Sequence, residues 1–215
     1  MFFLQKVKNE LKKKKEKNML RVCVVGSGGV GKSCVTIRFL KNEFNEYYDP
    51  TMEETYKTVM TYRGRQHHVE IVDTAGQEEF TTFLDSSLST GDAFMILYAI
   101  NSLSSWNDLQ ALRSKIFPPA NEARNSTQRI PCIIVGNKKD LENDRDTPQE
   151  TAEEYAASIR VPYIETSAKT GFNIHEAFEL IMSEIDRVRP DLLQKPSKSA
   201  RSVSSEHRKK DCRIA

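Results

Sequence analysis

Residues 26–33 (GSGGVGKS) combine glycines with a lysine and a hydroxyl group. They match the pattern G-x-x-x-x-G-K-S, between an apolar run and a stretch with helical periodicity. Glycines let successive backbone N–H groups turn inward toward phosphate oxygens, and a following helix adds the positive end of its dipole. A glycine-rich turn that only happens to precede a lysine is the weaker reading in this context. The segment therefore predicts a loop that binds nucleotide phosphates.

The individual residues of this loop suggest separate roles. We expect Lys32 to bridge the β- and γ-phosphates, where it would also act catalytically, and the Ser33 hydroxyl to ligate Mg²⁺. The residues expected to contact the nucleotide here are Gly28, Gly29, Val30, Gly31, Lys32, Ser33 and Cys34.

Two later segments suggest which base is bound. A phosphate loop alone does not separate GTPases from ATPases and nucleotide kinases. Asn137, Lys138 and Asp140 belong to an N-K-x-D sequence that follows an apolar run, and by itself this could be a polar turn. A carboxylate at Asp140 can accept from N1–H and the exocyclic amino group of guanine, whereas adenine offers neither pattern. Backbone amides of Ser167, Ala168 and Lys169, after the next apolar run, could meet the guanine O6.

With these motifs in order, residues 19 to about 190 resemble the Ras family of small GTPases. Residues 48–56 (YDPTMEETY) resemble its switch I and effector segment, and residues 73–79 (DTAGQEE) its switch II. The resemblance implies that Thr51 is a second Mg²⁺ ligand, that Asp73 holds a metal-bound water, and that the Gly76 amide contacts the γ-phosphate.

The same resemblance assigns three further side chains. Phe44 would pack against guanine, Glu46 would lie near the ribose, and Gln77 would orient the attacking water. Taken singly, Phe44 could be core, Thr51 a turn residue and Gln77 a solvated loop residue, but their joint order favours the functional roles. The sequence departs from the family at Glu54, where Ras proteins carry Asp, and in a longer polar stretch after residue 117.

Short apolar runs alternate with helical patterns through the middle of the chain. We expect strands at residues 20–25, 55–61, 67–72, 93–99, 130–135 and 161–164, the second and third forming a hairpin at the sheet edge. This alternation predicts a mainly parallel sheet with ligands at the carboxyl ends of its strands. With the resemblance, the expected fold class is α/β, a P-loop NTPase or G-domain. Its six-stranded, mainly parallel sheet would have one antiparallel edge strand and helices on both faces.

The last two helices carry sequence signals at their amino ends. Thr147 before Pro148 predicts a capping threonine with proline at the first helical position, and Asn173 with Glu176 predicts a second cap of this kind. The last helix should bury one stripe formed by Ile174, Phe178, Ile181 and Ile185.

Basic residues concentrate in the two tails. Residues 1–18 carry a net charge of +5 and residues 191–215 carry +4, so an overall charge of +2 leaves −7 for the middle. We expect three parts: a basic, disordered extension (1–18) that could also form a weak amphipathic helix on a membrane, a GTPase domain (19–190), and a flexible basic tail (191–215). An acidic domain between basic tails argues against nucleic acid and for an anionic inner-leaflet membrane.

The sequence finishes with residues 212–215 (CRIA), a C-a-a-X pattern in which the final alanine favours farnesylation of Cys212. One prenyl chain binds membranes only marginally, so the basic tails would supply the second signal. We therefore expect the cytoplasmic face of a membrane, the plasma membrane in particular.

The main hypothesis is a GTP-binding switch that slowly hydrolyses GTP to GDP. Effectors, an exchange factor and a GTPase-activating protein would bind through residues 48–56 and 75–80. No arginine within the motifs is placed to neutralise the transition state, so a partner's arginine would accelerate hydrolysis by roughly 10³ to 10⁵. The alternatives are a guanine-nucleotide-binding scaffold without significant hydrolysis and an ATP-using P-loop enzyme.

Overall fold

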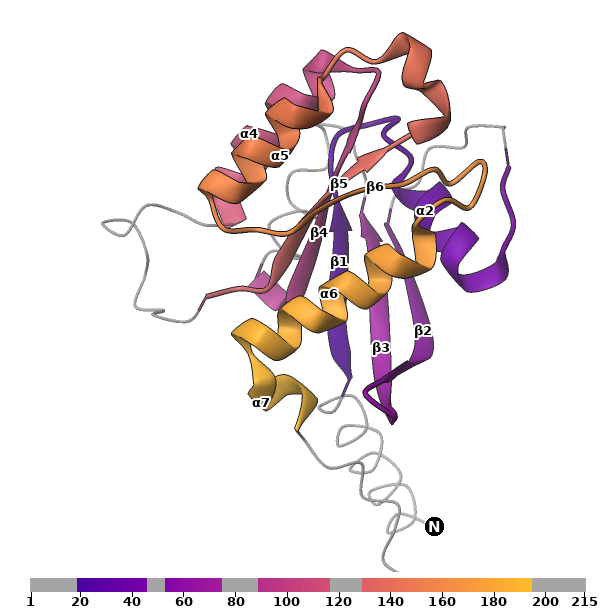
Figure 1. Cartoon of the computed structure of the whole chain (residues 1–215). Helices are drawn as coiled ribbons and strands as arrows, with labels where there is room; N and C mark the ends of the chain where they lie inside the picture. Colours follow the sequence, from indigo (N-terminus) through magenta and orange to yellow (C-terminus); the bar gives the residue numbers. More distant parts are fainter. Residues whose placement is uncertain (1–18, 46–52, 75–88, 117–128, 195–215) are drawn as a thin grey trace, which may run out of the picture.

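The computed structural model describes residues 19–45, 53–74, 89–116 and 129–194 (Figure 1). The strands are β1 (Leu20–Val25), β2 (Glu53–Tyr62), β3 (Arg65–Thr74), β4 (Ala93–Ala99), β5 (Cys132–Asn137) and β6 (Tyr163–Glu165). The helices are α2 (Lys32–Lys41), α4 (Leu103–Ile116), α5 (Gln149–Ser158), α6 (Ile174–Val188), the short α7 (Pro190–Leu193) and the 3₁₀ helix η2 (Lys139–Asp144).

The strands form one six-stranded sheet in the order β2-β3-β1-β4-β5-β6. All neighbouring strands run parallel except β2, which pairs antiparallel with β3 at one edge. The hairpin between β2 and β3 turns through Arg63 and Gly64, whose φ angles are 48° and 72°. Two successive positive φ angles are typical of the tight turn that matches strand twist. The expected fold class and edge hairpin are confirmed.

Helices cover both faces of the sheet. Alternate residues of β1 enter different cores: Val22 and Val24 belong to the core under α2 and α6, and Cys23 and Val25 to the core under α4 and α5. Figure 1 shows α6 crossing one face of the sheet. On the other face the Trp106 ring packs edge-on against Tyr155, which joins α4 to α5. This burial on both faces explains why β1, β4 and β5 appear in the sequence as continuous apolar runs.

The predicted stripe of α6 is confirmed. Ile174, Phe178, Ile181 and Ile185 are all buried in the core that α6 shares with α2. Phe178 also stacks on Phe39 of α2 with ring centroids 3.8 Å apart. This contact places α6 against the helix that follows the phosphate loop.

The two predicted caps are wrong in detail. Helix α5 starts one residue later than expected, with Pro148 as its cap, and the buried Thr147 hydroxyl has no hydrogen-bond partner among the described residues. The backbone N–H groups of Asp146 and Thr147 both donate to the Ile100 carbonyl, at 2.9 and 3.1 Å, and this fixes the approach to the helix.

Asn173 does occupy the cap position of α6, but its backbone is left-handed and its side chain makes no capping bond within the described part of the chain. Its amide instead donates to the Glu165 carbonyl at 2.9 Å. The side chain therefore ties α6 to the end of β6 and does not satisfy the first turn of its own helix.

The carboxyl ends of the parallel strands bring the sequence motifs to one edge of the sheet. The phosphate loop follows β1, Asp73 lies at the end of β3, Asn137 ends β5 and Glu165 ends β6. The strand order reverses next to β1, with β3 on one side and β4 on the other. In α/β sheets, ligands bind outside the carboxyl ends of the strands at such a reversal.

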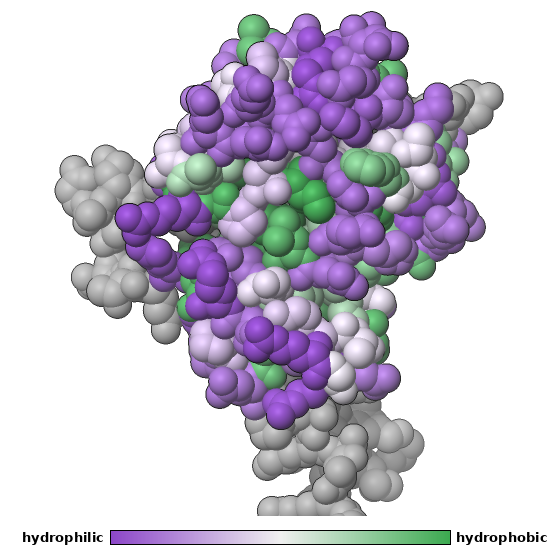
Figure 2. Space-filling view, viewed as in Figure 1, coloured by the Kyte–Doolittle hydropathy of each residue, from purple (hydrophilic) through white to green (hydrophobic). Residues whose placement is uncertain are grey.

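The described surface is mostly hydrophilic on the face shown in Figure 2, with hydrophobic residues in a band across its middle. The large exposed hydrophobic residues, Val59, Leu103 and Phe172, come from separate elements. Single exposures of this kind are ordinary. Among the described helices, none is long and apolar enough to cross a membrane.

Candidate nucleotide-binding site

The phosphate loop joins β1 to α2 through an exposed stretch that one side chain anchors. Gly28 and Gly29 are exposed, whereas the Val30 side chain is buried in the core. Val30 can therefore contact a ligand only through its backbone. Gly31 precedes the helix in a left-handed conformation, with φ 93°. Within the described residues, no side chain caps α2 and its first turn has no acidic group, so its positive dipole end stays uncompensated.

Lys32 holds its ammonium group over this loop. The Nζ atom donates to the carbonyl oxygens of Gly26 and Ser27, each at 2.9 Å. An ammonium has three N–H donors, so one remains for a phosphate oxygen. Burial lowers the pKa of Lys32 to about 8, and the negative charge of Asp73 opposes this shift. Lys32 thus lies against the loop backbone, and its contact with phosphates stays a prediction.

Asp73 provides the test for a metal ion. Both carboxylate oxygens are buried without a hydrogen-bond partner among the described residues. Burial raises the pKa of Asp73 to about 6, although the nearby Ser33 hydroxyl and the charge of Lys32 act in the opposite direction. A hydrated cation would satisfy both oxygens, and hard oxygen donors suit Mg²⁺. Ser33 and Asp73 therefore fit the predicted ion.

Asn137 connects the phosphate loop with the predicted base-binding loop. Its Nδ2 donates to the Val30 carbonyl at 2.8 Å. Its Oδ1 accepts from the Thr166 hydroxyl at 3.2 Å and from the Ala168 backbone N–H at 3.3 Å. The side chain is almost fully buried. Asn137 thus acts as a bridge between loops, a role that the sequence motif did not reveal.

The base-reading residues also lie together. The Ser167 hydroxyl donates to the Asp140 carboxylate at 2.5 Å, which joins the N-K-x-D loop to the segment after β6. Asp140 is exposed, as a group that must reach a ligand should be. Lys138 has a left-handed backbone (φ 70°), while Ala168 is buried and Lys169 exposed. The structure therefore brings together the two segments that were predicted to contact guanine.

Arg38 is a site residue that the motifs missed. Its Nε donates to the Ala168 carbonyl at 2.7 Å, and a second guanidinium nitrogen donates to the Lys169 carbonyl. The guanidinium also lies 6.0 Å from the centre of the Phe44 ring. Phe44 is half-buried against the core. This position is compatible with a role in core packing and with the predicted contact with guanine. No local pattern signals these two contacts of Arg38, because the carbonyls of Ala168 and Lys169 are 130 and 131 residues away.

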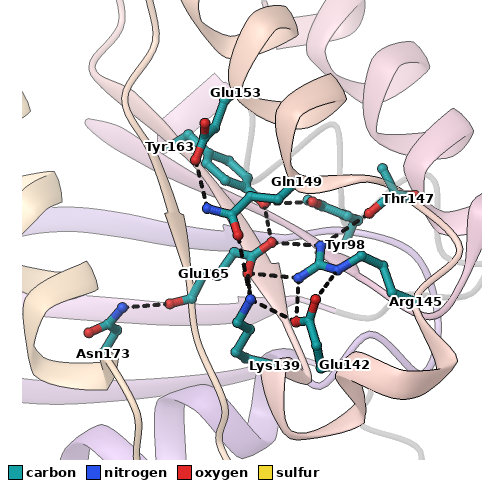
Figure 3. A network of polar contacts seen from close by, with 10 residues as sticks. All are labelled: Tyr98, Lys139, Glu142, Arg145, Thr147, Gln149, Glu153, Tyr163, Glu165 and Asn173. Carbon is teal, nitrogen blue, oxygen red and sulfur yellow. Dashed lines mark hydrogen bonds and ion pairs between the residues drawn. The ribbon is translucent and has the colours of Figure 1, made fainter.

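A second group that the motifs missed is a network of polar contacts around Glu165 (Figure 3). Arg145 donates to both carboxylate oxygens of Glu165, at 2.8 and 2.9 Å. Lys139 lies 2.7 Å from one of these oxygens, and the Tyr163 hydroxyl donates to the other at 2.8 Å. Arg145 and Lys139 also pair with Glu142, each at 2.7 Å. The sequence indicates this network only weakly, through Glu165 at the end of a predicted strand and the basic residues Lys139 and Arg145 near the N-K-x-D segment.

This network keeps its central carboxylate charged. Burial alone would raise the pKa of Glu165, but hydrogen bonds from Arg145, Lys139 and Tyr163 hold it below its usual range. Because the pKa of Glu165 is lower in the folded state than its unfolded value of about 4.3, ionised Glu165 stabilises the fold at pH values above that value. This stabilisation is lost as the pH falls below about 4.3 and through the lower folded-state pKa. Near neutral pH the network is therefore fully formed.

Several predicted residues lie outside the described ranges. These are Glu46, Thr51, Gly76, Gln77 and Cys212, together with residues 1–18, 48–52, 75–80 and most of the tail from 191. Their roles stay predictions.

A cavity of about 410 Å³ lies at the opposite edge of the sheet from these motifs. Its lining residues are Met19, Arg21, Lys57, Glu70, Thr90 and Asp92.

Gly31 offers a direct test of the contact between the two loops. A Cβ at this position would lie 2.4 Å from the Nδ2 of Asn137, and Gly31→Ala must therefore displace the amide from the Val30 carbonyl. We expect GDP affinity, measured by titration of labelled GDP, to fall at least about tenfold. Gly64→Ala is the control, because it has the same left-handed strain with no atom within 4 Å. Equal GDP affinities for the two variants would show that the close approach is unimportant.

Comparison with known proteins agrees with this geometry. The Ras-like protein RAS2 of Hydra vulgaris is 34% identical over 186 residues, covering 85% of this chain and 94% of its own length. The Ras-like protein rasZ of Dictyostelium discoideum is 32% identical over 194 residues, covering 90% and 88%. A sequence model of the Ras family matches residues 21–187. The chain therefore belongs to the Ras family.

Proposed function

We propose that this protein is a molecular switch that binds GTP, hydrolyses it slowly to GDP, and presents different surfaces in the two states. Small GTPases of the Ras family bind GTP or GDP with Mg²⁺ and hydrolyse GTP in general. The observation that carries the proposal is the Asn137 side chain, which links the backbone of Val30 to the segment around Ala168. This link brings a phosphate loop and a base-reading loop within reach of one nucleotide.

Each end of the nucleotide would meet a different kind of group. Lys32 has one donor free for a phosphate oxygen, and the uncompensated amino end of α2 attracts negative charge. At the other end, Asp140 would accept from the N1–H and amino group of guanine. Mg²⁺, when bound by Ser33 and near Asp73, would neutralise phosphate charge. Adenine would leave the Asp140 carboxylate without donors, so ATP is the wrong ligand for this site.

The base assignment can be tested by competition. Unlabelled GDP should displace labelled GDP from the protein, whereas ADP should not do so at a hundredfold excess. Asp140→Asn should lower GDP affinity by roughly 10² and improve binding of xanthosine diphosphate, whose 2-oxo group can accept from an amide. Asp144→Asn is the matched control, because this exposed residue lies on the same helix η2. Displacement by ADP as effective as by GDP would exclude guanine recognition.

Hydrolysis and switching are proposed from family membership and motif order. Gln77 would orient the attacking water, and Thr51 and Gly76 would respond to the γ-phosphate. Effectors and regulators would then recognise residues 48–56 and 75–80 in the GTP state. A scaffold that holds the nucleotide without hydrolysis is the alternative. Hydrolysis rates and amide exchange in the two nucleotide states distinguish the switch from the scaffold.

Single-turnover assays should give hydrolysis slower than about 1 s⁻¹ for the purified protein. Gln77→Leu should reduce that rate at least about tenfold without loss of GTP binding, because the water is no longer oriented. Gln66→Leu, an exposed residue of β3, should leave the rate unchanged. Amide exchange over residues 48–56 and 75–80 should be slower with bound GTP than with bound GDP. Undetectable hydrolysis with identical exchange in the two states would favour the scaffold.

Membrane attachment is a separate part of the proposal. Cys212 would carry a farnesyl group, and the basic tails would add about 1 kcal/mol for each suitably placed Lys or Arg near anionic lipid. This places the working protein at the cytoplasmic face of a membrane.

The anchor can be tested with purified components. Farnesyltransferase and farnesyl diphosphate should modify the wild-type chain but not Cys212→Ser, as judged by intact mass. The modified protein should sediment with phosphatidylserine vesicles at low salt and much less at high salt, because the basic tails contribute electrostatically. Modification of the Cys212→Ser chain, or salt-independent sedimentation, would contradict the proposed two-part anchor.

A further inference from the structure

Glu165 lies between the two loops that would read guanine. It ends β6 and is followed directly by Thr166 and Ser167, while its carboxylate binds Lys139, the residue before Asp140. Lys139 is also held through its backbone N–H, which donates to the Thr166 carbonyl at 2.9 Å. One buried carboxylate thus connects the chain on one side of Asp140 with the chain that leads to its Ser167 partner.

Arg145 extends the same connection to the far end of helix η2. It binds both oxygens of Glu165 and also donates to the Thr147 carbonyl at 3.1 Å, beyond the helix. The segment that carries Asp140 is therefore fixed at Lys139 on one side and at Arg145 on the other. The Glu165 carboxylate contacts the side chains at both fixed points.

The Glu165 carboxylate has no acceptor position to spare. Its oxygens receive two hydrogen bonds from Arg145, one from Lys139 and one from Tyr163. Tyr163 is itself joined to the Tyr98 hydroxyl of β4 at 2.8 Å, so the network reaches into the sheet (Figure 3). A buried ion pair holds a unique geometry only when its remaining hydrogen-bonding capacity is satisfied, as it is here.

We propose that Glu165, together with Lys139 and Arg145, is a positioning residue for base selectivity. It holds Asp140 so that guanine is distinguished from a purine without the 2-amino group. The inference rests on the proposed GTP-binding function and deepens it. The Glu165 carboxylate is held by Arg145, Lys139 and Tyr163, and it acts through the loop that carries Asp140.

The test compares two nucleotides on the full-length protein. GDP and inosine diphosphate share the phosphates, the ribose, N1–H and O6, and differ only in the 2-amino group that Asp140 would bind. The ratio of their affinities, measured by competition against labelled GDP, therefore reports the placement of Asp140. In Glu165→Gln we expect this ratio to fall at least about fivefold. The reason is that a displaced Asp140 carboxylate would lose part of its charged hydrogen bond with the 2-amino group of guanine.

Glu184→Gln is a matched control. Glu184 has the same 5% side-chain exposure as Glu165 and also binds an arginine through two contacts, at 2.8 and 2.6 Å to Arg187. It lies on α6, away from the base-reading loops. This variant should weaken the fold to a similar degree and leave the GDP to inosine diphosphate ratio at the wild-type value.

The outcomes are distinct. If wild-type protein does not prefer guanine over adenine nucleotides, the proposed function fails, and this inference fails with it. If wild-type protein does prefer guanine but Glu165→Gln lowers both affinities equally, the role of Glu165 is only structural and the inference is overturned. If Glu165→Gln does not fold with GDP present, the partly exposed Lys139→Gln decides: a lowered ratio supports the inference, and an unchanged ratio overturns it.

Discussion

The side-chain amide of Asn137 joins the two halves of the site, and the arrangement of the loops depends on it. It gives a hydrogen bond to the phosphate loop at Val30 and accepts two from the segment after β6, at Thr166 and Ala168. All three contacts are buried, so their loss would leave polar groups unsatisfied at about 1–3 kcal/mol each. The short approach also explains why position 31 is glycine, since a Cβ would occupy the place of the amide.

The two halves differ in how their charges are satisfied. On the phosphate side, burial moves the pKa of Lys32 down to about 8 and that of Asp73 up to about 6, so both groups are pushed toward neutrality. An anion beside Lys32 and a cation beside Asp73 would restore both charges, and part of the binding free energy would come from this restoration. On the base side, Glu165 is already held ionised by its own partners. The protein thus satisfies the buried carboxylate on the base side by itself, whereas the buried charges on the phosphate side would be satisfied only with a ligand.

The sequence predicted those features that depend on local chemistry. Apolar runs located β1, β4, β5 and β6 to within a few residues, and in β1, β4 and β5 burial on both faces excludes polar side chains. The edge strands β2 and β3 were located instead by β-rich runs on either side of a glycine turn. The loop motifs were placed correctly, since parallel strands bring their carboxyl ends to one edge. The caps at Thr147 and Asn173 were wrong because contacts from elsewhere in the fold, at Ile100 and Glu165, determine the backbone there.

Long-range pairs were out of reach of the same reasoning. Arg38 binds carbonyls 130 and 131 residues away, and Arg145 binds a carboxylate 20 residues further along the chain. Nothing in local spacing or periodicity encodes such partners. The roles of Thr51, Gly76 and Gln77 come from the resemblance and stay predictions, whereas the contacts of Arg38 and Glu165 became visible only in the folded chain.

Different interactions therefore hold the phosphate loop and the loop predicted to contact the base. Backbone conformation fixes the phosphate loop, through left-handed Gly31 and the Val30 carbonyl. The base-reading loop is fixed by charge: Lys139 and Arg145 face Glu142 and Glu165, two cations against two anions. In a partly buried site such a balance depends on all four groups, because removing one charge leaves a net charge among the remaining three. Lys139, at the unspecified position of the N-K-x-D motif, is therefore an internal counter-ion for Glu165, the residue that ends β6.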